Sequence, residues 1–392
     1  MNEANYDVII VGGGAAGLSA ALMLVRARRR VLVVDARAPR NAKAGHMHGY
    51  LSRDGMPPLE LLERGRDEVL SYGGVVVTDY VEKAERSEEG FHVTLASGCD
   101  ATGRQLLVAT GLTDVLPDVP GLAELWGTDV HVCPYCHGWE VQDGMLATLA
   151  TGPFSTHHTL LLRQWTDDLV YFLNGHELDA ADRMKLTARG VRIEERLVRR
   201  VVGVGDGGGD REGGGDGGGG LSAAGDEGRL GASSGDGRLG TAGGDGRLGT
   251  AGGDGRPGTA GGDGRPGTVG GDGEGGEGPR LSGVELADGT VVPREAVFLV
   301  PRFEPNSALL DALGCEKDAE TGWVTTGAGG RTSVPGVWVA GNVSDPTNGV
   351  IAAAGAASAI AAQINAVLVE ADVEAAVAAV EGVEGEAVEG EG

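Results

Sequence analysis

Two cysteines lie close together in the run Cys133-Pro134-Tyr135-Cys136-His137-Gly138-Trp139-Glu140. A Cys-x-x-Cys pair can close a small disulfide ring, and without a secretory signal it indicates redox chemistry or metal binding. A structural zinc site needs two more ligands, whereas the other cysteines, Cys99 and Cys315, stand alone in polar segments. A purely structural disulfide is the second alternative, but such bonds are rare in the cytosol. We therefore expect a redox-active pair and no metal.

A glycine-rich turn near the N-terminus predicts a dinucleotide site. Residues 7–11 form a short apolar run typical of a buried strand, and residues 18–24 have the pattern of a helix. Between them lies G-x-G-x-x-G, whose glycines allow a tight turn, close approach of a pyrophosphate, and close packing of helix on strand. A second strand, residues 31–34, ends in an acid that suits a ribose. The predicted cofactor residues are Gly12, Gly14, Ala15, Ala16, Gly17 and Asp35.

Two stretches of the 392-residue chain have compositions that predict disorder. Residues 203–279 are dominated by Gly, Asp and Arg, and residues 370–392 by Ala, Val, Glu and Gly, so neither has much to bury. The first carries 13 acids and 6 arginines and the second carries 8 acids and no base, so together they supply −15 of the formal −25 charge. The remainder is only modestly acidic, which argues against nucleic acid as a partner.

Within the Gly-rich insert, residues 235–270 contain four nine-residue repeats. Calcium-binding β-rolls also repeat every nine residues, but they need an acid at the sixth position and a large apolar residue at the eighth. Here those positions hold Leu248 and Thr250, so we exclude calcium binding. Residues 198–202 and 280–286 are expected to be neighbouring strands. The insert is therefore predicted to be an enlarged hairpin loop, which costs little because closure entropy grows only logarithmically with loop length.

The start of the chain leads at once into a strand and has no basic-then-apolar run. No window approaches 18 uninterrupted apolar residues. We expect a cytoplasmic protein without a membrane segment.

Two further turns follow apolar strands. Residues 75–97 are predicted to form a meander, and residues 105–108 a buried strand that ends in Ala109-Thr110-Gly111. Residues 336–340 lead into Gly341-Asn342-Val343, ahead of a helix expected from Val350 to about residue 368. Together with the glycine turn and the cysteine pair, these segments resemble the pyridine nucleotide–disulfide flavoproteins of the low-molecular-weight thioredoxin reductase type. The resemblance covers about residues 5–202 and 280–369.

The resemblance implies that FAD occupies the first dinucleotide site. It places Asp35 at the adenosine ribose, Asn342 and Val343 at the ribityl chain and pyrophosphate, and the Val350 N–H at the flavin, where a helix N-terminus stabilises negative charge. Asn342 stands where the family usually has Asp, and Gly349 where it has Gln. The loop after Asp35 matches one that wraps the flavin. The further cofactor contacts implied are Arg40, Asn41, His48, Ala109, Thr110, Gly111 and Gly341.

A second nucleotide motif is incomplete. Thioredoxin reductases carry another G-x-G-x-x-A turn for NADPH, followed by an arginine pair. This chain has Ala150, Gly152 and Ser155 at the motif positions, and the Cβ of Ala150 disfavours a turn with positive φ. The next strand, residues 169–173, ends in Asn174-Gly175-His176, with no arginine pair and no acid. Use of NADPH is therefore left open.

The resemblance also assigns the cysteines: Cys136 lies against the flavin and Cys133 exchanges with the substrate. Because a thiolate is the nucleophile, a base must take its proton. The reductases have Asp after the second cysteine, whereas this chain has His137, whose ordinary pKa near 6.5 suits proton acceptance. The alternative is that His137 only caps or packs. The run around it resembles a subgroup of flavin-dependent dithiol oxidases that form disulfides in gliotoxin- and holomycin-type natural products, with oxygen regenerating the flavin.

We predict an α/β fold with two Rossmann-like, three-layer (ββα) domains, the second inserted into the first. The FAD-binding domain is expected at residues 1–116 and 303–369. The second domain is expected at 117–302 and contains the cysteine pair and the insert at 203–279. A disordered acidic tail is expected at 370–392.

The predicted function is oxidation of a small-molecule dithiol to a disulfide by Cys133, Cys136 and His137, with FAD as cofactor and oxygen as acceptor. The first alternative is an NADPH-dependent reductase of thioredoxin. The second, from another class, is a non-catalytic flavoprotein redox sensor, which would not need a paired base. Family resemblance implies a homodimer.

Overall fold

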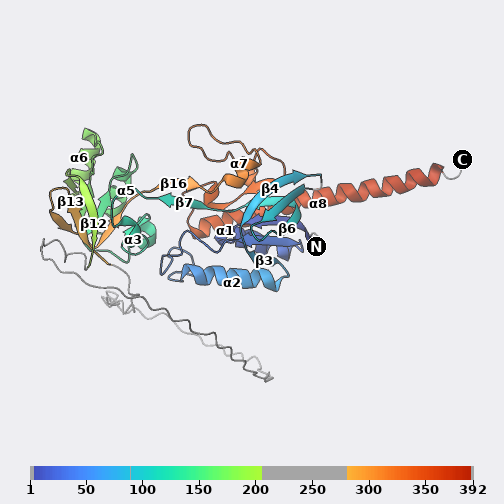
Figure 1. The fold of residues 1–392 in the computed structure, drawn as a ribbon, viewed down its shortest axis with the longest axis horizontal. Helices are drawn as coiled ribbons and strands as arrows, with labels where there is room; N and C mark the ends of the chain where they lie inside the picture. Colours follow the sequence, from blue (N-terminus) through green and yellow to red (C-terminus); the bar gives the residue numbers. More distant parts are fainter. Residues whose placement is uncertain (1–3, 89, 205–279, 390–392) are drawn as a thin grey trace, which may run out of the picture. The chain divides into compact units, whose positions relative to one another are not determined.

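The computed structural model describes residues 4–88, 90–204 and 280–389 (Figure 1). The predictions made for the Gly-rich insert and its repeats fall outside these ranges.

The first sheet is formed by strands from both ends of the chain. Its order is β3-β2-β1-β6-β5-β4, and β17 pairs with β6. The pairing is parallel among β1, β2, β3, β6 and β17. It is antiparallel in the meander formed by β4, β5 and β6. The strands are β1 (Ala4–Val11), β2 (Val31–Asp35), β3 (Val75–Thr78), β4 (Val81–Ser87), β5 (Gly90–Leu95), β6 (Asp100–Val108) and β17 (Val337–Val339). The prediction that residues 75–78 belong to the meander is wrong, because they pair in parallel with β2.

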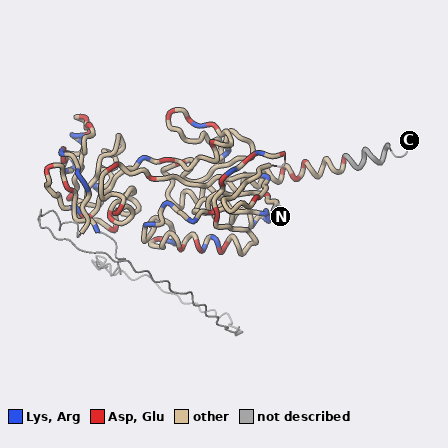
Figure 2. The backbone as a smooth tube through the Cα atoms, viewed as in Figure 1, with Lys and Arg blue, Asp and Glu red and all other residues tan. Residues whose placement is uncertain are grey.

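Two long helices cover one face of this sheet. α1 (Ala15–Arg26) packs against α8 (Val350–Glu389), and Leu24 and Ile364 are both fully buried in their shared core. α2 (Pro58–Ser71) packs beside α1, and Figure 2 shows acidic and basic residues alternating along it. Apolar side chains of the opposite face pack with the meander and with α7 (Ala308–Ala312). Short 3-10 turns, η1 (Ala328–Gly330) and η2 (Gly341–Val343), lie beside α8.

Helix α8 is longer than predicted. The sequence suggested an end near residue 368 and disorder from residue 370, but the helix continues to Glu389 (Figure 1). Alanine and glutamate favour helix, and Asp372 forms ion pairs with Arg29 and Arg104. Residues 350–381 are long and apolar enough to cross a membrane by length and composition alone. The core helix of a folded protein passes the same test, and the first part of α8 packs on α1.

The second sheet is entirely parallel, with the order β11-β10-β9-β15-β8. Its strands are β8 (Val130–His131), β9 (Leu146–Leu149), β10 (Leu169–Phe172), β11 (Arg192–Glu194) and β15 (Ala296–Phe298). The helices of this part are α3 (Leu122–Leu125), α4 (Pro134–His137), α5 (Ser155–Leu162) and α6 (Ala180–Ala188). One mixed sheet and one parallel sheet, both with covering helices, confirm the predicted α/β class with Rossmann-like sheets.

Two smaller antiparallel sheets complete the fold. One contains β12 (Val198–Gly203), β13 (Leu281–Leu286) and β14 (Val291–Pro293), as the sequence predicted for the strands that flank the insert. Glu285 on β13 accepts hydrogen bonds from Arg199 (2.8 Å) and Arg200 (2.6 Å) on β12. The other sheet pairs β7 (Leu112–Val115) with β16 (Arg302–Pro305).

Candidate active site

The first glycine turn has the geometry that its sequence predicted. Gly12 has φ +104°, and a Cβ there would overlap the carbonyl oxygen of Ala109. A Cβ on Gly17 would overlap the Gly12 carbonyl, so the third glycine lets α1 lie close to β1. Gly14, the N-cap of α1, has no side-chain cap, and a Cβ there would meet nothing within 4 Å. The turn therefore leaves open space in front of helix N–H groups, which suits a pyrophosphate.

Asp35 lies beside this turn at the end of β2. Its carboxylate is buried beneath Gly13 and accepts the Arg37 N–H at 3.2 Å. Arg66 on α2 reaches the other carboxylate oxygen at 3.4 Å. Arg66 is itself only 6% exposed, and its Nε has no hydrogen-bond partner among the described residues. Sequence reasoning missed this arginine, because nothing in an amphipathic helix marks one basic residue as facing inward.

The C-terminal turn is packed against the first turn. Gly341 has φ +77°, and a Cβ built on it would lie 2.9 Å from the Ala16 Cβ. The Asn342 amide donates to the carbonyls of Asp345 (2.9 Å) and Asn348 (3.0 Å), which fixes the segment that leads into α8. Aspartate could not donate these bonds, so the departure from the family residue has a structural reason. The amide oxygen still provides an acceptor for a cofactor hydroxyl.

Asn306 is a second residue that sequence reasoning missed. The Thr110 hydroxyl donates to the Asn306 carbonyl (2.7 Å), and the Asn306 amide donates to the Thr110 carbonyl (3.0 Å). Thr113 also donates to the Asn306 side chain (2.9 Å). The Ala109-Thr110-Gly111 turn is therefore held by residues far away in the sequence. The only local signal was the Pro305-Asn306 turn after a short strand.

The residues of the predicted flavin loop have several partners. Arg40 forms a bidentate pair with Asp114, both bonds 2.7 Å, and its guanidinium lies over the Phe303 ring. Its charge is therefore already neutralised by the protein. His48 lies 3.4 Å from Asp54 and 3.3 Å from Glu140 of the cysteine segment.

Asn41 lies in the same loop, where its carbonyl accepts the Ala44 N–H (3.1 Å). The predicted cofactor contacts of Arg40, Asn41 and His48 remain predictions.

These arrangements fit FAD. An uncapped helix N-terminus with open space before it, a buried carboxylate beside it and an amide acceptor at Asn342 would hold the pyrophosphate, a ribose and the ribityl chain. The N-terminus of α8 at Val350 supplies a second set of helix N–H groups.

The cysteine pair forms a disulfide at the start of α4. The Cα atoms of Cys133 and Cys136 are 5.2 Å apart, and both residues are half-buried. Cys133 is the N-cap residue of α4. Gly138 ends the helix where a Cβ would collide with the Pro134 carbonyl and the Trp165 ring. That glycine lets the redox turn pack tightly against Trp165, which follows α5. Among the described residues, no group of three His, Cys, Asp or Glu side chains could hold a metal.

His137 lies in an apolar environment. Its ring stacks on that of His131, with centroids 4.2 Å apart and planes inclined by 17°. Burial, with a smaller effect of His48, lowers the pKa of His137 to about 4. Burial and the neighbouring His137 lower the pKa of His131 to about 3. At neutral pH both rings are uncharged, although the sequence suggested an ordinary pKa for His137.

These histidines predict a loss of stability in mild acid. Unfolded imidazoles titrate near pH 6.5, whereas the native ones titrate near 4 and 3, so the unfolded chain binds more protons below pH 6.5. Each ring should therefore lower the free energy of unfolding by about 2 kcal/mol between pH 7 and pH 5, and above pH 6.5 the effect is absent. Urea unfolding at a series of pH values measures this. His131→Phe should reduce the slope, and His158, whose pKa is also lowered by burial, should keep its share. An equal slope in that variant would contradict the assignment.

The second nucleotide turn is closed by its own side chains. The Ser155 hydroxyl oxygen accepts the N–H groups of Thr151 (3.0 Å) and Gly152 (3.2 Å). The Thr151 hydroxyl donates to the Val300 carbonyl (2.8 Å), and Ser155 is fully buried. At the end of β10, the Asn174 side chain accepts the Val198 N–H (3.0 Å). The backbone N–H groups and side chains that would contact a nucleotide therefore already form hydrogen bonds within the protein.

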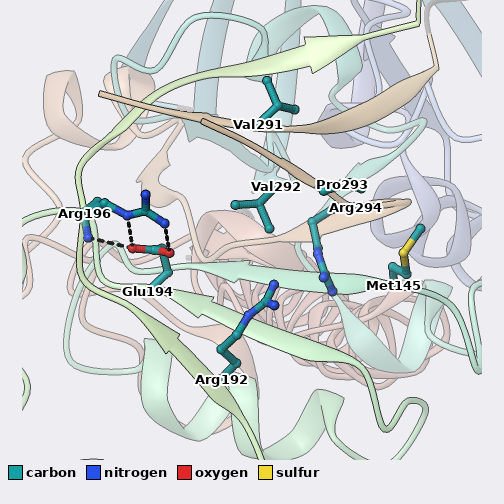
Figure 3. Close-up of a pocket in the computed structure, with 8 residues that line it drawn as sticks. All are labelled: Met145, Arg192, Glu194, Arg196, Val291, Val292, Pro293 and Arg294. Carbon is teal, nitrogen blue, oxygen red and sulfur yellow. Dashed lines mark hydrogen bonds and ion pairs between the residues drawn. The ribbon is translucent and has the colours of Figure 1, made fainter. Parts of the chain in front are cut away.

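A hollow of about 470 Å³ lies elsewhere on this part, between β11 and β14 (Figure 3). Its charged walls are already paired: Arg196 with Glu194 (2.7 Å) and Arg294 with Asp168 (2.7 Å). Met145 and Arg294 of this hollow precede β9 and β15, whereas the cysteine pair and the Ser155 turn follow the ends of strands. Its lining residues are Met145, Arg192, Glu194, Arg196, Val291, Val292, Pro293 and Arg294. We place no step of the chemistry there.

Comparison with known proteins agrees with this geometry. The profile described as pyridine nucleotide-disulphide oxidoreductase matches residues 6–150. The thioredoxin reductase tcpT of Claviceps purpurea is 33% identical, over 52% of this chain and 67% of its own length. The thioredoxin reductase aclD of Aspergillus oryzae is 34% identical, over 45% and 59%. The crystal structure of HlmI is 42% identical and covers 96% of both chains, with a TM-score of 0.74.

Two Rossmann-like sheets, an FAD-type glycine turn and a Cys-x-x-Cys disulfide define a flavin-dependent disulfide oxidoreductase. The chain belongs to the pyridine nucleotide-disulphide oxidoreductase family, in its thioredoxin reductase-like branch, whose members bind FAD. It spans about half to two thirds of the length of the curated relatives it matches.

Proposed function

We propose that this protein oxidises a small-molecule dithiol to a disulfide, with FAD as cofactor and oxygen as terminal acceptor. The observation that carries the direction of the reaction is the closed second turn. Ser155 accepts the N–H groups of Thr151 and Gly152, the groups that a pyrophosphate would need. An enzyme that cannot draw electrons from NADPH must receive them from its thiol substrate.

The cysteine pair carries out the exchange. One substrate thiolate attacks the Cys133 sulfur, the disulfide breaks, and Cys136 leaves as a thiolate. The second substrate thiol loses its proton and attacks the substrate sulfur of the mixed disulfide, which releases Cys133. The substrate gives up two electrons to the cysteine pair and two protons to bases. When bound, FAD supplies the two-electron acceptor that restores the disulfide, with oxygen as the final oxidant.

His137 accepts a substrate proton in this scheme. Its neutral ring is ready as an acceptor at pH 7, but a pKa near 4 makes transfer from a thiol of pKa ~8.5 uphill by roughly 6 kcal/mol. A neighbouring negative charge raises the pKa of an imidazole. The Cys136 thiolate that forms as the disulfide breaks, one residue away, provides that charge. Proton acceptance by His137 is therefore coupled to opening of the disulfide.

Anaerobic stopped-flow reduction of the flavin tests this function. We expect dithiothreitol to bleach the flavin absorbance rapidly and NADPH to do so at least 100-fold more slowly. His137→Ala should keep its FAD and slow reduction by the dithiol about 10²- to 10⁴-fold at pH 7. The loss should be partly recovered at high pH, where thiols ionise without help. Rapid reduction by NADPH would contradict the proposal.

The names of the curated relatives favour a second candidate, an NADPH-dependent thioredoxin reductase. It would require NADPH to enter a turn whose amides are already bonded to Ser155. Reduction of thioredoxin by NADPH in the presence of this protein would support it. A homodimer belongs to the proposal on the same family resemblance, and a cytoplasmic location belongs to it as an expectation from the sequence.

A further inference from the structure

A buried histidine that the scheme above does not use lies directly behind the redox turn. His131 is the last residue of β8, two positions before Cys133, and is 6% exposed. Its Nδ1 is buried without a hydrogen-bond partner among the described residues. A buried polar atom left unpaired destabilises the fold. The scheme above gives this unpaired ring no part in proton transfer, so a role for it must come from its packing.

The contacts of His131 supply one. Its ring faces that of His137 in a near-parallel stack, and it also contacts Phe298 of β15, with centroids 5.3 Å apart. His131 and Phe298 are register partners on the paired strands β8 and β15, so the His131 ring packs against a neighbour within the sheet. His137, in contrast, lies on a single helical turn of four residues and has no hydrogen bond from its ring to another described residue. Among the described residues, the stack with His131 is the ring contact of His137.

Burial keeps this stack uncharged at rest, although other titratable groups lie nearby. His48 of the flavin loop acts electrostatically on His137, and its own neighbours are the carboxylates of Asp54 and Glu140. His158 of α5 contacts Phe298, and its ring is bonded to the Val132 carbonyl (2.7 Å). Two cationic rings at 4.2 Å would repel each other, so only one can carry a proton at a time.

We propose that His131 is a positioning residue, whose flat, buried ring fixes the plane of the His137 imidazole and excludes water from one of its faces. The role requires a planar ring at this position and does not require its nitrogens. It rests on the proposed function, because His137 must accept the substrate proton for its orientation to matter.

The test compares two substitutions that fill the same buried space. His131→Phe keeps a flat ring, whereas His131→Leu keeps apolar volume without a plane. We expect flavin reduction by dithiothreitol to be within about threefold of wild type in His131→Phe. In His131→Leu the limiting rate should fall about 10- to 100-fold, as for a misplaced catalytic group. The dithiol concentration at half-saturation should not change, because His131 does not contact the substrate.

A second readout does not depend on turnover. The imidazole of His137, followed by NMR in the oxidised holoprotein, should titrate near pH 4 in wild type and in His131→Phe. In His131→Leu the midpoint should move upward toward 6.5, because water reaches the uncovered face. His158→Leu is the matched control: it removes another buried histidine in contact with Phe298 and should leave the midpoint in place.

Two results would overturn the proposal. A His131→Leu enzyme with the wild-type rate and midpoint would show that His131 only fills the core. A His131→Phe enzyme as slow as His131→Leu would show that the nitrogens, and not the plane, are required. If His131→Leu does not retain FAD, the flexible His131→Met replaces it. If dithiothreitol fails to reduce even the wild-type flavin, the proposed function fails, and the NMR midpoints still decide the stacking role.

Discussion

The Cys133→Ser enzyme should lose all turnover and yet gain a long-wavelength absorbance band. The proposed roles place Cys136 against the flavin, so without its disulfide partner Cys136 should form a thiolate–flavin charge-transfer pair. Cys136→Ser removes that donor and should show no band. It should instead trap Cys133 as a mixed disulfide with the dithiol, which mass spectrometry of the intact protein detects.

The control for this pair of variants is Cys99→Ser, because Cys99 is an exposed free cysteine in a turn between strands. It should keep full turnover and an unchanged spectrum. A charge-transfer band in Cys136→Ser, in place of Cys133→Ser, would show that the two cysteine roles are reversed. Turnover by either active-site variant would show that the disulfide is not the redox centre.

Gly14→Val should yield a folded but colourless protein. A Cβ at Gly14 meets no protein atom within 4 Å, so the substitution does not strain the apoprotein. The added side chain enters the space where the pyrophosphate must approach the N-terminus of α1. Flavin absorbance per chain, with circular dichroism as the measure of folding, checks this expectation.

The second turn offers a matched substitution. A Cβ at Gly152 also meets nothing within 4 Å, in the corresponding turn before α5. Because Ser155 already closes that turn, Gly152→Val should leave both the FAD content and dithiol turnover nearly unchanged. A Gly14→Val protein that stays yellow would show that FAD is bound elsewhere. Loss of dithiol turnover in Gly152→Val would show that the second turn binds a ligand needed for the reaction.

The parts of the site that sequence reasoning predicted are those encoded in short segments. The turn at Gly12 requires glycine because of a positive φ and a close carbonyl, and the disulfide requires two cysteines one helical turn apart. Each requirement restricts the residue types within a short segment, so it can be recognised in the sequence. Arg66, Asn306 and His131 gained their places through contacts with residues far away in sequence. No spacing rule identifies them, because pairing of distant strands and helices decides which side chains meet.

Three errors have the same origin. The strand at residues 75–78 was assigned to the meander because an apolar run does not show which strand it will pair with. In the structure it pairs in parallel with β2. The helix beyond residue 368 was missed because composition alone cannot show that Arg29 and Arg104 would hold Asp372. The pKa of His137 was also misjudged, since burial of a side chain depends on the whole fold.

The strands on either side of the insert form an anchored junction. Gly203 and Leu281 are paired, and Asp129 accepts bonds from both the Leu281 N–H (2.7 Å) and the Arg280 side chain (2.9 Å). Doubling the length of a loop costs only about 0.6 kcal/mol. A compact guest domain whose ends lie close together, such as a fluorescent reporter or an affinity module, could therefore replace residues 205–279 while the catalytic parts stay folded. The junction is therefore a natural insertion point, at which a sensor domain can be joined to the redox enzyme within one chain.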